Sequence, residues 1–388
     1  MNSNMLKKKK LIRTTTIPIT FQEILSGQLK YVQENSEFDV IAVSAGGKVF
    51  QNVLKENNVR GYEVPFTRKT FSLWSDFVAF IKLIKIFHKE KPFIVHSQGS
   101  KDALLCMIAG CICRVPHRLY TIAGLGDLSG IRGLMLRIAE WVTFFFSTKL
   151  YPNSVNMNKI YLARGMYKAS KAKVIGFGSS NGCDIDKFSL SNISKNEIEE
   201  VKKSYDINTG ITFCFVGRIV GDKGINELVR AFKRLCESND CHLIIVGRFE
   251  KDLYQDIFPD VADNLAENPR IHLTGYQSDV RKYIAASDAL ILPSYREGMP
   301  NVVMQACAMN RPCIVTNING CNEIIENGVN GSIIESHSES QLFDAMKYYC
   351  DNPDVIKKMG QVAREIIASK FAKKEFLKLL VDEYNSLS

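Results

Sequence analysis

The 388-residue sequence predicts an α/β protein made of two Rossmann-like halves. Apolar, strand-like runs alternate with helical patterns along the whole chain, which is typical of doubly wound parallel sheets. A composition that is 46% hydrophobic is sufficient, at this length, for two domains with separate cores. Glycine, serine and asparagine are enriched around residues 178–192, as expected of a linker.

The expected strands are short runs of apolar residues, many of them β-branched or aromatic. In the first half they fall at residues 10–15, 39–44, 93–96, 118–122, 149–151 and 173–175. In the second half they fall at residues 212–216, 242–246, 271–274, 289–292, 313–316 and 332–334. These runs predict a first domain at residues 1–180 and a second at residues 190–370. Ligands of such sheets bind at the carboxyl ends of the strands.

Charge is distributed unequally between the two halves. Residues 1–188 carry 27 Lys+Arg against 13 Asp+Glu, a balance of +14, and residues 189–388 carry 23 against 28, a balance of −5. Basic residues of the first half flank apolar, aromatic segments at 71–91 and 130–149, which suits an anionic membrane surface. Core helices with a solvated edge are the alternative. We expect no nucleic-acid partner, because no recognition motif accompanies the charge.

Cysteine usage and hydropathy indicate the compartment. The eleven cysteines are scattered, and many lie inside apolar runs, as buried free thiols do. Cys106, Cys111 and Cys113 cluster without a second pair at zinc spacing. The N-terminal residues are basic but lack the apolar stretch of a signal peptide, and no run of about 18 apolar residues follows. We expect a cytoplasmic protein attached peripherally to the cytoplasmic face of the inner membrane.

The most informative segment runs from Asp288 to Glu326. It predicts a buried strand, then a loop containing Glu297, then a helix at residues 300–309 with a proline in its first turn. The free amides at a helix start bind diphosphates well. Gln305 follows Glu297 by eight residues, roughly 12 Å of helical rise, which suits a nucleotide sugar. Residues expected at the diphosphate are Gly298, Met299, Pro300, Asn301 and Val302.

This segment resembles the E-x7-E region of family 4 retaining glycosyltransferases, with Gln305 in place of the second glutamate. NGCDIDKF at 181–188, FVGRIVGDKGINEL at 215–228 and GYQSDVRKYIAASD at 275–288 are similar to further elements of that family, in the same order. Bacterial capsule, O-antigen and lipid-linked-saccharide glycosyltransferases are the members it resembles. The resemblance implies GT-B architecture, two Rossmann-like domains facing across a cleft, with a C-terminal helix at 373–388 packing back onto the first.

The resemblance also implies roles for the second domain, which would bind the nucleotide sugar. Glu297 would contact the transferred sugar, while Arg218 and Lys223 would stabilise charge on the leaving diphosphate. No divalent metal or other cofactor is expected. Glu323 either caps a helix or contributes to the site. The other residues expected to bind the donor are Gly217, at the glycine-rich turn, and Tyr276 and Gln277, near the base.

The first domain would bind the acceptor, and its site is less defined. His96 follows the third strand and is one candidate; a buried, hydrogen-bonded histidine is the alternative. Gly124, Gly126 and Asp127 form a loop near the expected acceptor. Relatives often carry a histidine in a T-x-H-G pattern here, where this sequence has Ala123.

Together these features predict a retaining glycosyltransferase. It would move a hexose or an N-acetylhexosamine, with N-acetylgalactosamine as one candidate, from a UDP-sugar to a polyprenyl-diphosphate-linked saccharide. A non-catalytic sugar-nucleotide-binding partner is one alternative, because Gln305 and Ala123 both depart from the family pattern. A UDP-sugar epimerase of the same architecture is another, although it would not require a basic first domain.

Overall fold

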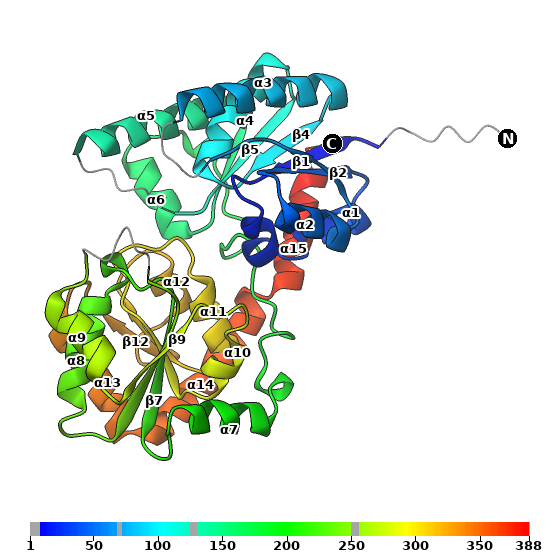
Figure 1. The fold of residues 1–388 in the computed structure, drawn as a ribbon. Coiled ribbons are helices and arrows are strands. Elements are labelled where there is room, and N and C mark those ends of the chain that lie inside the picture. The colour runs from blue at the N-terminus through cyan, green and yellow to red at the C-terminus, as the bar shows by residue number, and fades with distance from the viewer. Residues whose placement is uncertain (1–7, 68–71, 125–129, 250–255, 388) are drawn as a thin grey trace. The chain divides into compact units, whose positions relative to one another are not determined.

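The computed structural model describes residues 8–67, 72–124, 130–249 and 256–387. The chain forms two compact units. Unit 1 comprises Met1–Gly182 together with Lys374–Ser388, and unit 2 comprises Cys183–Lys373. Each unit contains a six-stranded parallel sheet with flanking helices (Figure 1), so the predicted α/β class is confirmed.

The sheet of unit 1 has the strand order β3-β2-β1-β4-β5-β6. Its strands are β1 Lys10–Thr14, β2 Asp39–Ser44, β3 Arg60–Glu63, β4 Ile94–Ser97, β5 His117–Ile122 and β6 Lys149–Pro152. Its helices are α1 Gln28–Asn35, α2 Lys48–Asn57, α3 Leu73–Glu90, α4 Ser100–Ile112, α5 Gly130–Phe146, α6 Val155–Ala163 and α15 Lys373–Asn385. Because β2 and β4 lie on either side of β1, the strand order reverses between β1 and β4.

The core of unit 1 forms because its central strands are apolar on both faces, as strands covered by helices must be. In β2, Val40 and Ala42 join one cluster with α1, α2 and α15, while Ile41 and Val43 join another with α3 and α4. The side chains that α15 adds to the first cluster are Phe376, Leu377, Leu380, Val381 and Tyr384. The C-terminal helix thus packs on unit 1, where the family resemblance implies it.

Two strands of unit 1 differ from the sequence prediction. Residues 173–175 do not form a strand, because an isolated bridge between Leu150 and Ala172 is followed by a turn at Gly176, whose φ is 57°. Conversely, the sequence predicts no strand at Arg60–Glu63, where the structure has β3. This edge strand pairs only with β2 and has no fully buried residue, so it lacks the apolar run that marks the central strands.

The sheet of unit 2 has the strand order β12-β11-β10-β7-β8-β9. Its strands are β7 Ile211–Val216, β8 Cys241–Val246, β9 Ile271–Gly275, β10 Ala289–Leu292, β11 Cys313–Thr316 and β12 Gly331–Ile334, each within one residue of the prediction. Its helices are α7 Lys195–Ser204, α8 Ile225–Leu235, α9 Pro259–Glu267, α10 Arg281–Ala285, α11 Asn301–Ala308, α12 Cys321–Ile324, α13 Glu339–Asp351 and α14 Pro353–Lys370.

The helix predicted at residues 300–309 is α11, which is one residue shorter at each end. Pro300 is its N-cap and not part of the first turn, since its ψ of 109° is extended. Proline suits this position because it has no N–H to leave unpaired and its ring fixes φ. The helix therefore begins with the amide of Asn301.

Candidate active site

Unit 2 brings two loops together at the carboxyl edge of its sheet. β7 is followed by residues 217–224 and β10 by residues 293–300, and these two strands are parallel neighbours. From β7 the chain builds β8 and β9 on one side, then crosses to β10 on the other. Open α/β sheets bind ligands where the strand order reverses in this way. The Lys223 and Glu297 motifs therefore both lie at the switch point of unit 2.

Lys223 and Glu297 form an ion pair between these two loops. Lys223 Nζ lies 2.7 Å from Glu297 Oε1, and the two side chains are 16% and 17% exposed. Removing either partner would leave a charge that is largely shielded from water, so the pair holds both groups in place. The sequence predicts both as site residues but does not predict that they touch.

Two residues that the sequence analysis missed hold the Glu297 loop. Asn319 Nδ2 donates to the backbone oxygen of Glu297 at 2.7 Å and lies 3.4 Å from that of Gly298. Gly320 has a φ of +80°, and a Cβ there would lie 1.8 Å from Gly298 O, so only glycine fits. Glu323 Oε1 accepts from Gly320 N at 3.1 Å, so this side chain caps the start of α12, which is one of the two roles expected for it. The N-G-x-x-E spacing at residues 319–323 is the sequence pattern from which these two residues could have been predicted.

The Lys223 loop is packed directly against the loop that follows β10. Gly224 has a φ of +71°, and a Cβ there would lie 2.1 Å from Pro293 O. Tyr295 N donates to Asp222 O at 3.0 Å across the same junction. The glycines of this turn would be expected to let the backbone approach a ligand, as predicted for Gly217. At Gly224 the structure shows a different reason, since the glycine admits the backbone of the neighbouring loop.

The start of α11 follows Glu297 directly and offers unpaired backbone amides. The first amide that bonds within the helix is that of Met304, which donates to Pro300 O at 3.4 Å, and no side chain caps the helix. The amides before it have no intrahelical acceptor, and the positive end of the helix dipole lies here. Gly298, Met299 and Pro300 have no side chain that donates a hydrogen bond, so backbone amides are the groups that this turn offers an anion.

The remaining predicted donor residues lie on three elements of unit 2. Arg218 is exposed and follows Gly217 at the end of β7, while Gln305 is half-buried on α11. Tyr276 follows β9 and is 59% exposed. Gln277 Nε2 donates to Thr274 O at 2.9 Å, so this side chain is tied to its own loop. Base recognition by the backbone at this loop stays a prediction.

On the acceptor side, His96 ends up inside unit 1. Its Nδ1 lies 2.6 Å from Tyr384 Oη and its Nε2 lies 2.8 Å from Thr121 Oγ1, and the ring is fully buried. Burial, and then the charge of Arg13, hold its pKa well below the usual range, so the ring is neutral at pH 7. The buried, hydrogen-bonded alternative therefore describes His96. Gly124 is exposed after β5; Gly126 and Asp127 lie outside the described residues.

A polar network that the sequence analysis missed lies at the switch point of unit 1, between β1 and β4. Thr14 Oγ1 donates to Asp102 Oδ2 at 2.6 Å, and Thr16 Oγ1 donates to Oδ1 at 2.8 Å. Asp102 lies in the first turn of α4 and is fully buried. Burial raises the pKa of its carboxyl to about 6 although both hydroxyls lower it. This carboxyl therefore changes protonation near the lower end of the physiological range.

We expect Asp102→Asn to flatten the pH dependence of stability. The pKa of Asp102 rises from 3.8 to about 6 on folding, so the folded state binds more protons between these values. The free energy of unfolding must then fall as pH rises through this window, by roughly 3 kcal/mol. Urea unfolding at several pH values from about 4 to 7 measures it. Glu90, whose pKa is lowered from 4.5 to about 2, adds to the slope at the acid end, but equally in both proteins. An equal slope in both proteins would contradict the assignment.

The described residues offer no set of clustered metal ligands. Among these residues, no group of three or more His, Cys, Asp or Glu side chains is placed to hold a metal ion. Metal-independent chemistry stays a prediction.

Comparison with known families finds a match within unit 2. Residues 197–366 match the family model described as "Glycosyl transferases group 1". The match covers most of unit 2. The matched range includes Arg218, Lys223, Glu297 and Gln305, and it also includes Gly320, which holds the Glu297 loop.

Relatives of the whole chain are glycosyltransferases by name. The chain is 29% identical over 384 residues, 98% of both proteins, to the capsular polysaccharide biosynthesis glycosyltransferase CapM of Staphylococcus aureus. It is 29% identical over 343 residues to the Escherichia coli UDP-Gal:alpha-D-GlcNAc-diphosphoundecaprenol alpha-1,3-galactosyltransferase, covering 87% of this chain and 86% of the relative. Anabaena HepE in complex with UDP and glucose superposes with a TM-score of 0.81 at 18% identity, covering 97% and 100%. The fold is the predicted GT-B architecture.

Proposed function

We propose that this protein is a retaining glycosyltransferase that transfers a hexose or N-acetylhexosamine from a UDP-sugar to a polyprenyl-diphosphate-linked saccharide. The observation that carries the proposal is the Lys223–Glu297 ion pair, which lies at the switch point of unit 2 and directly before the amides of α11. A cation, a carboxylate and free amides that meet at one edge of the sheet match the chemistry of a sugar diphosphate.

Each group has a role when the glycosidic bond to the diphosphate breaks. Negative charge grows on the leaving diphosphate, and the α11 amides and Lys223 are the groups placed to stabilise it. An ammonium has three N–H donors, so Lys223 can bind a phosphate oxygen while one donor stays on Glu297. Glu297 keeps a free oxygen that can accept from sugar hydroxyls. Arg218, exposed at the end of β7, adds a second cation.

The acceptor class is inferred from two further features. The E. coli relative is named for an acceptor built on diphosphoundecaprenol, and CapM is named for capsular polysaccharide biosynthesis. The balance of +14 over residues 1–188 suits an acceptor that carries a diphosphate. In a retaining transfer the leaving phosphate oxygen can take the proton of the attacking hydroxyl, so the missing histidine at Ala123 is compatible with activity.

The decisive experiment follows UDP release from a set of UDP-hexoses and UDP-N-acetylhexosamines, with and without polyprenyl-diphosphate saccharides. We expect release that depends on the acceptor, and a product whose anomeric configuration by NMR equals that of the donor. Binding of a UDP-sugar without any transfer would favour the non-catalytic partner. Conversion of the UDP-sugar without an acceptor would favour an epimerase, and an inverted product would overturn the retaining mechanism.

Gln305 tests the nucleotide half of the site. Its amide can both donate to and accept from ribose hydroxyls, whereas a carboxylate only accepts. We expect Gln305→Leu to raise the donor KM by an amount worth about 1 kcal/mol, a typical net hydrogen bond, and Gln305→Glu to be tolerated. Calorimetry with UDP on the three proteins measures this. Equal affinity of the leucine variant would show that the ribose is held elsewhere.

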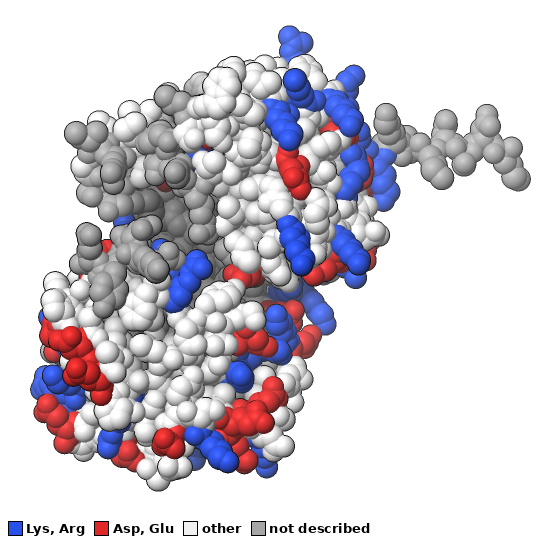
Figure 2. All heavy atoms as spheres, viewed as in Figure 1, with Lys and Arg blue, Asp and Glu red and all other residues white. Residues whose placement is uncertain are grey.

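We also propose that unit 1 attaches to an anionic membrane. None of the described helices is both long and apolar enough to cross a bilayer. The outer faces of α3 and α5 nevertheless expose large apolar side chains, namely Trp74 at 78%, Phe77 at 56%, Leu134 at 54%, Ile138 at 55%, Trp141 at 52% and Phe145 at 62%. On the face in Figure 2, Lys and Arg gather on the right-hand side of unit 1. Phe144, which lies in the predicted membrane segment 130–149, is instead buried against Tyr161.

Sedimentation with vesicles checks this attachment. We expect binding to anionic vesicles that weakens as salt rises, because salt screens exposed charges. Trp74→Ser combined with Trp141→Ser should reduce it further. Tyr348→Ser, at an exposed aromatic residue of unit 2, is the matched control and should change nothing. Equal binding to neutral vesicles at all salt concentrations would contradict the electrostatic part.

A further inference from the structure

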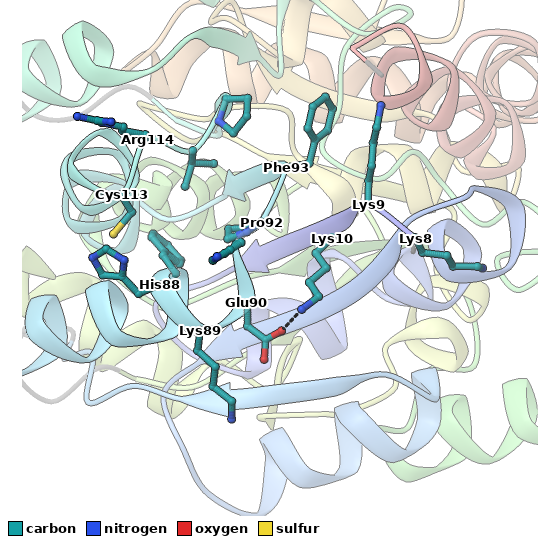
Figure 3. A pocket seen from close by; sticks show the side chains of 14 residues that line it. Lys8, Lys9, Lys10, His88, Lys89, Glu90, Pro92, Phe93, Cys113 and Arg114 are labelled. Carbon is teal, nitrogen blue, oxygen red and sulfur yellow. Dashed lines mark hydrogen bonds and ion pairs between the residues drawn. The ribbon is translucent and has the colours of Figure 1, made fainter. Parts of the chain in front are cut away.

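Unit 1 contains a basic pocket that none of the preceding chemistry uses. It has a volume of about 770 Å³ and opens between the ends of α3 and α4 and the starts of β1 and β4 (Figure 3). This is the amino edge of the sheet, opposite the edge that carries Thr14 and Asp102. Its ionisable lining residues are Lys8, Lys9, Lys10, His88, Lys89, Glu90, Lys91, Cys113 and Arg114.

The lysine and arginine side chains of the pocket outnumber its carboxylates. Its carboxylate, Glu90, is already bound by Lys10 Nζ at 2.8 Å and by Arg60 Nη1 at 2.8 Å. Hydrogen bonds from these groups lower the pKa of Glu90 to about 2 against its burial, so it remains an anion. Lys9 and Lys89 lie over aromatic rings, with Nζ 4.4 Å and 5.3 Å from the ring centres. Lys91 and Arg114 make no ion pair with a described carboxylate.

The backbone at two of these cations is unusual. Lys91 ends α3 with a φ of 48°, and Arg114 follows α4 with a φ of 54°. Left-handed positions after helices normally hold glycine or asparagine, because a Cβ is strained there. α2 follows that rule and ends at Asn58, with a φ of 49°. Cations do favour helix C-termini, but Lys89 already supplies one in the last turn of α3 without this strain. Strained residues that gather at one pocket indicate a binding role.

Further cations lie around a histidine that borders the pocket. His117 packs edge-on against the pocket residue Phe93, with ring centres 4.7 Å apart. Burial lowers the pKa of His117, and Lys149, Lys9 and Arg118 lower it further by repelling its proton. A bound anion would oppose these three charges and raise that pKa.

We propose that this pocket binds the phosphate group of an anionic ligand. The number of unpaired cations, the two strained cationic positions and the cations around His117 all suit a multiply charged oxyanion. A lipid headgroup and a soluble phosphate compound share this chemistry. Because the pocket lies at the edge of the sheet opposite its switch point, this inference does not rest on the proposed transfer reaction.

The test uses Lys91→Gly combined with Arg114→Gly. These changes remove two charges, and glycine relieves the strain at both positions, so the variant should be at least as stable as the wild type. Asn58→Gly is the matched control, because it makes the same backbone change at an uncharged helix end of unit 1. We expect the double variant to bind a phosphate ligand at least tenfold more weakly, and Asn58→Gly to bind as the wild type does.

Two binding experiments distinguish the sources. Inorganic pyrophosphate is titrated by calorimetry in the presence of saturating UDP, which removes any contribution of the donor site. Vesicles of phosphatidylglycerol in phosphatidylcholine are sedimented with the same proteins. Weakening with pyrophosphate supports a soluble ligand, and weakening with vesicles alone supports a lipid headgroup. Unchanged binding in both, or equal weakening by Asn58→Gly, overturns the proposal.

An NMR titration of His117 provides a readout other than affinity. We expect the pKa of His117 to rise when pyrophosphate or the vesicles bind to the wild type, and to move less in the double variant. A purely structural role of Lys91 and Arg114 at helix ends would leave this ligand-induced rise unchanged, which would contradict the proposal.

Discussion

Glu297→Ala and Lys223→Met each lower kcat/KM by about 10²-fold or more while the protein stays folded, which is the expected effect of losing one preorganised charged contact in a transition state. The two residues come from loops 74 positions apart and meet at 2.7 Å beside the α11 amides. Loss of Lys223 removes a cation from the leaving diphosphate. Loss of Glu297 removes an acceptor for sugar hydroxyls and a partner that holds Lys223.

Arg218→Ala should have a similar effect on kcat/KM, since it removes the other cation at the end of β7. Arg218 is exposed, so its loss should leave stability unchanged. UDP-release kinetics together with thermal unfolding separate the two properties. Near-wild-type turnover in any of these folded variants would exclude that residue from the catalytic site.

The matched control is a second ion pair of unit 2. Arg230 Nε lies 2.7 Å from Asp260 Oδ2, and both side chains are more than a third exposed, at 39% and 52%. Arg230→Met removes a charge of the same sign from the same unit, away from the switch point. We expect unchanged kinetics, because this pair lies away from the site. We also expect an unchanged fold, because an exposed ion pair contributes little to stability. If this variant lost activity as Lys223→Met does, net charge would be the cause instead of the site.

Gly320→Ala is expected to destabilise unit 2 and to inactivate it. A Cβ at this position would lie 1.8 Å from the backbone oxygen of Gly298, so the Glu297 loop must move. The left-handed backbone and the steric clash together cost about 2–5 kcal/mol. Displacement of Glu297 should also lower kcat in whatever fraction remains folded, because a misplaced catalytic group loses much of its effect.

Gly328→Ala distinguishes the clash from the backbone strain. Gly328 has nearly the same φ, +78° against +80°, but no atom lies within 4 Å of a Cβ built there. We expect it to lose only the strain component, about 1–2 kcal/mol, and to keep full activity. Denaturant unfolding and UDP release measure both variants. Equal losses of stability in the two would show that the contact with Gly298 is not what requires glycine at position 320.

The strands of unit 2 could be predicted from sequence within one residue. Its four central strands, β7, β8, β10 and β11, are buried apolar runs, and the edge strands β9 and β12 still carry two or more apolar residues. The helix start after Glu297 was predictable for a similar reason, since proline marks it. Edge strand β3 was not, because a strand with one neighbour and no buried residue has no apolar run. A run of apolar residues indicates a buried strand, so a strand that is not buried lacks this signal in the sequence.

The α/β class, the order of the strands of unit 2 along the chain and the charged residues that follow each of them could thus be derived from the sequence. Which of these residues come into contact depends on the tertiary structure. The Lys223–Glu297 contact forms because β7 and β10 are neighbours in the sheet. His96 is not available to a ligand, because it is buried and hydrogen-bonded to Tyr384 of α15. Strand order and the return of α15 depend on packing between distant segments, which no local window of sequence contains.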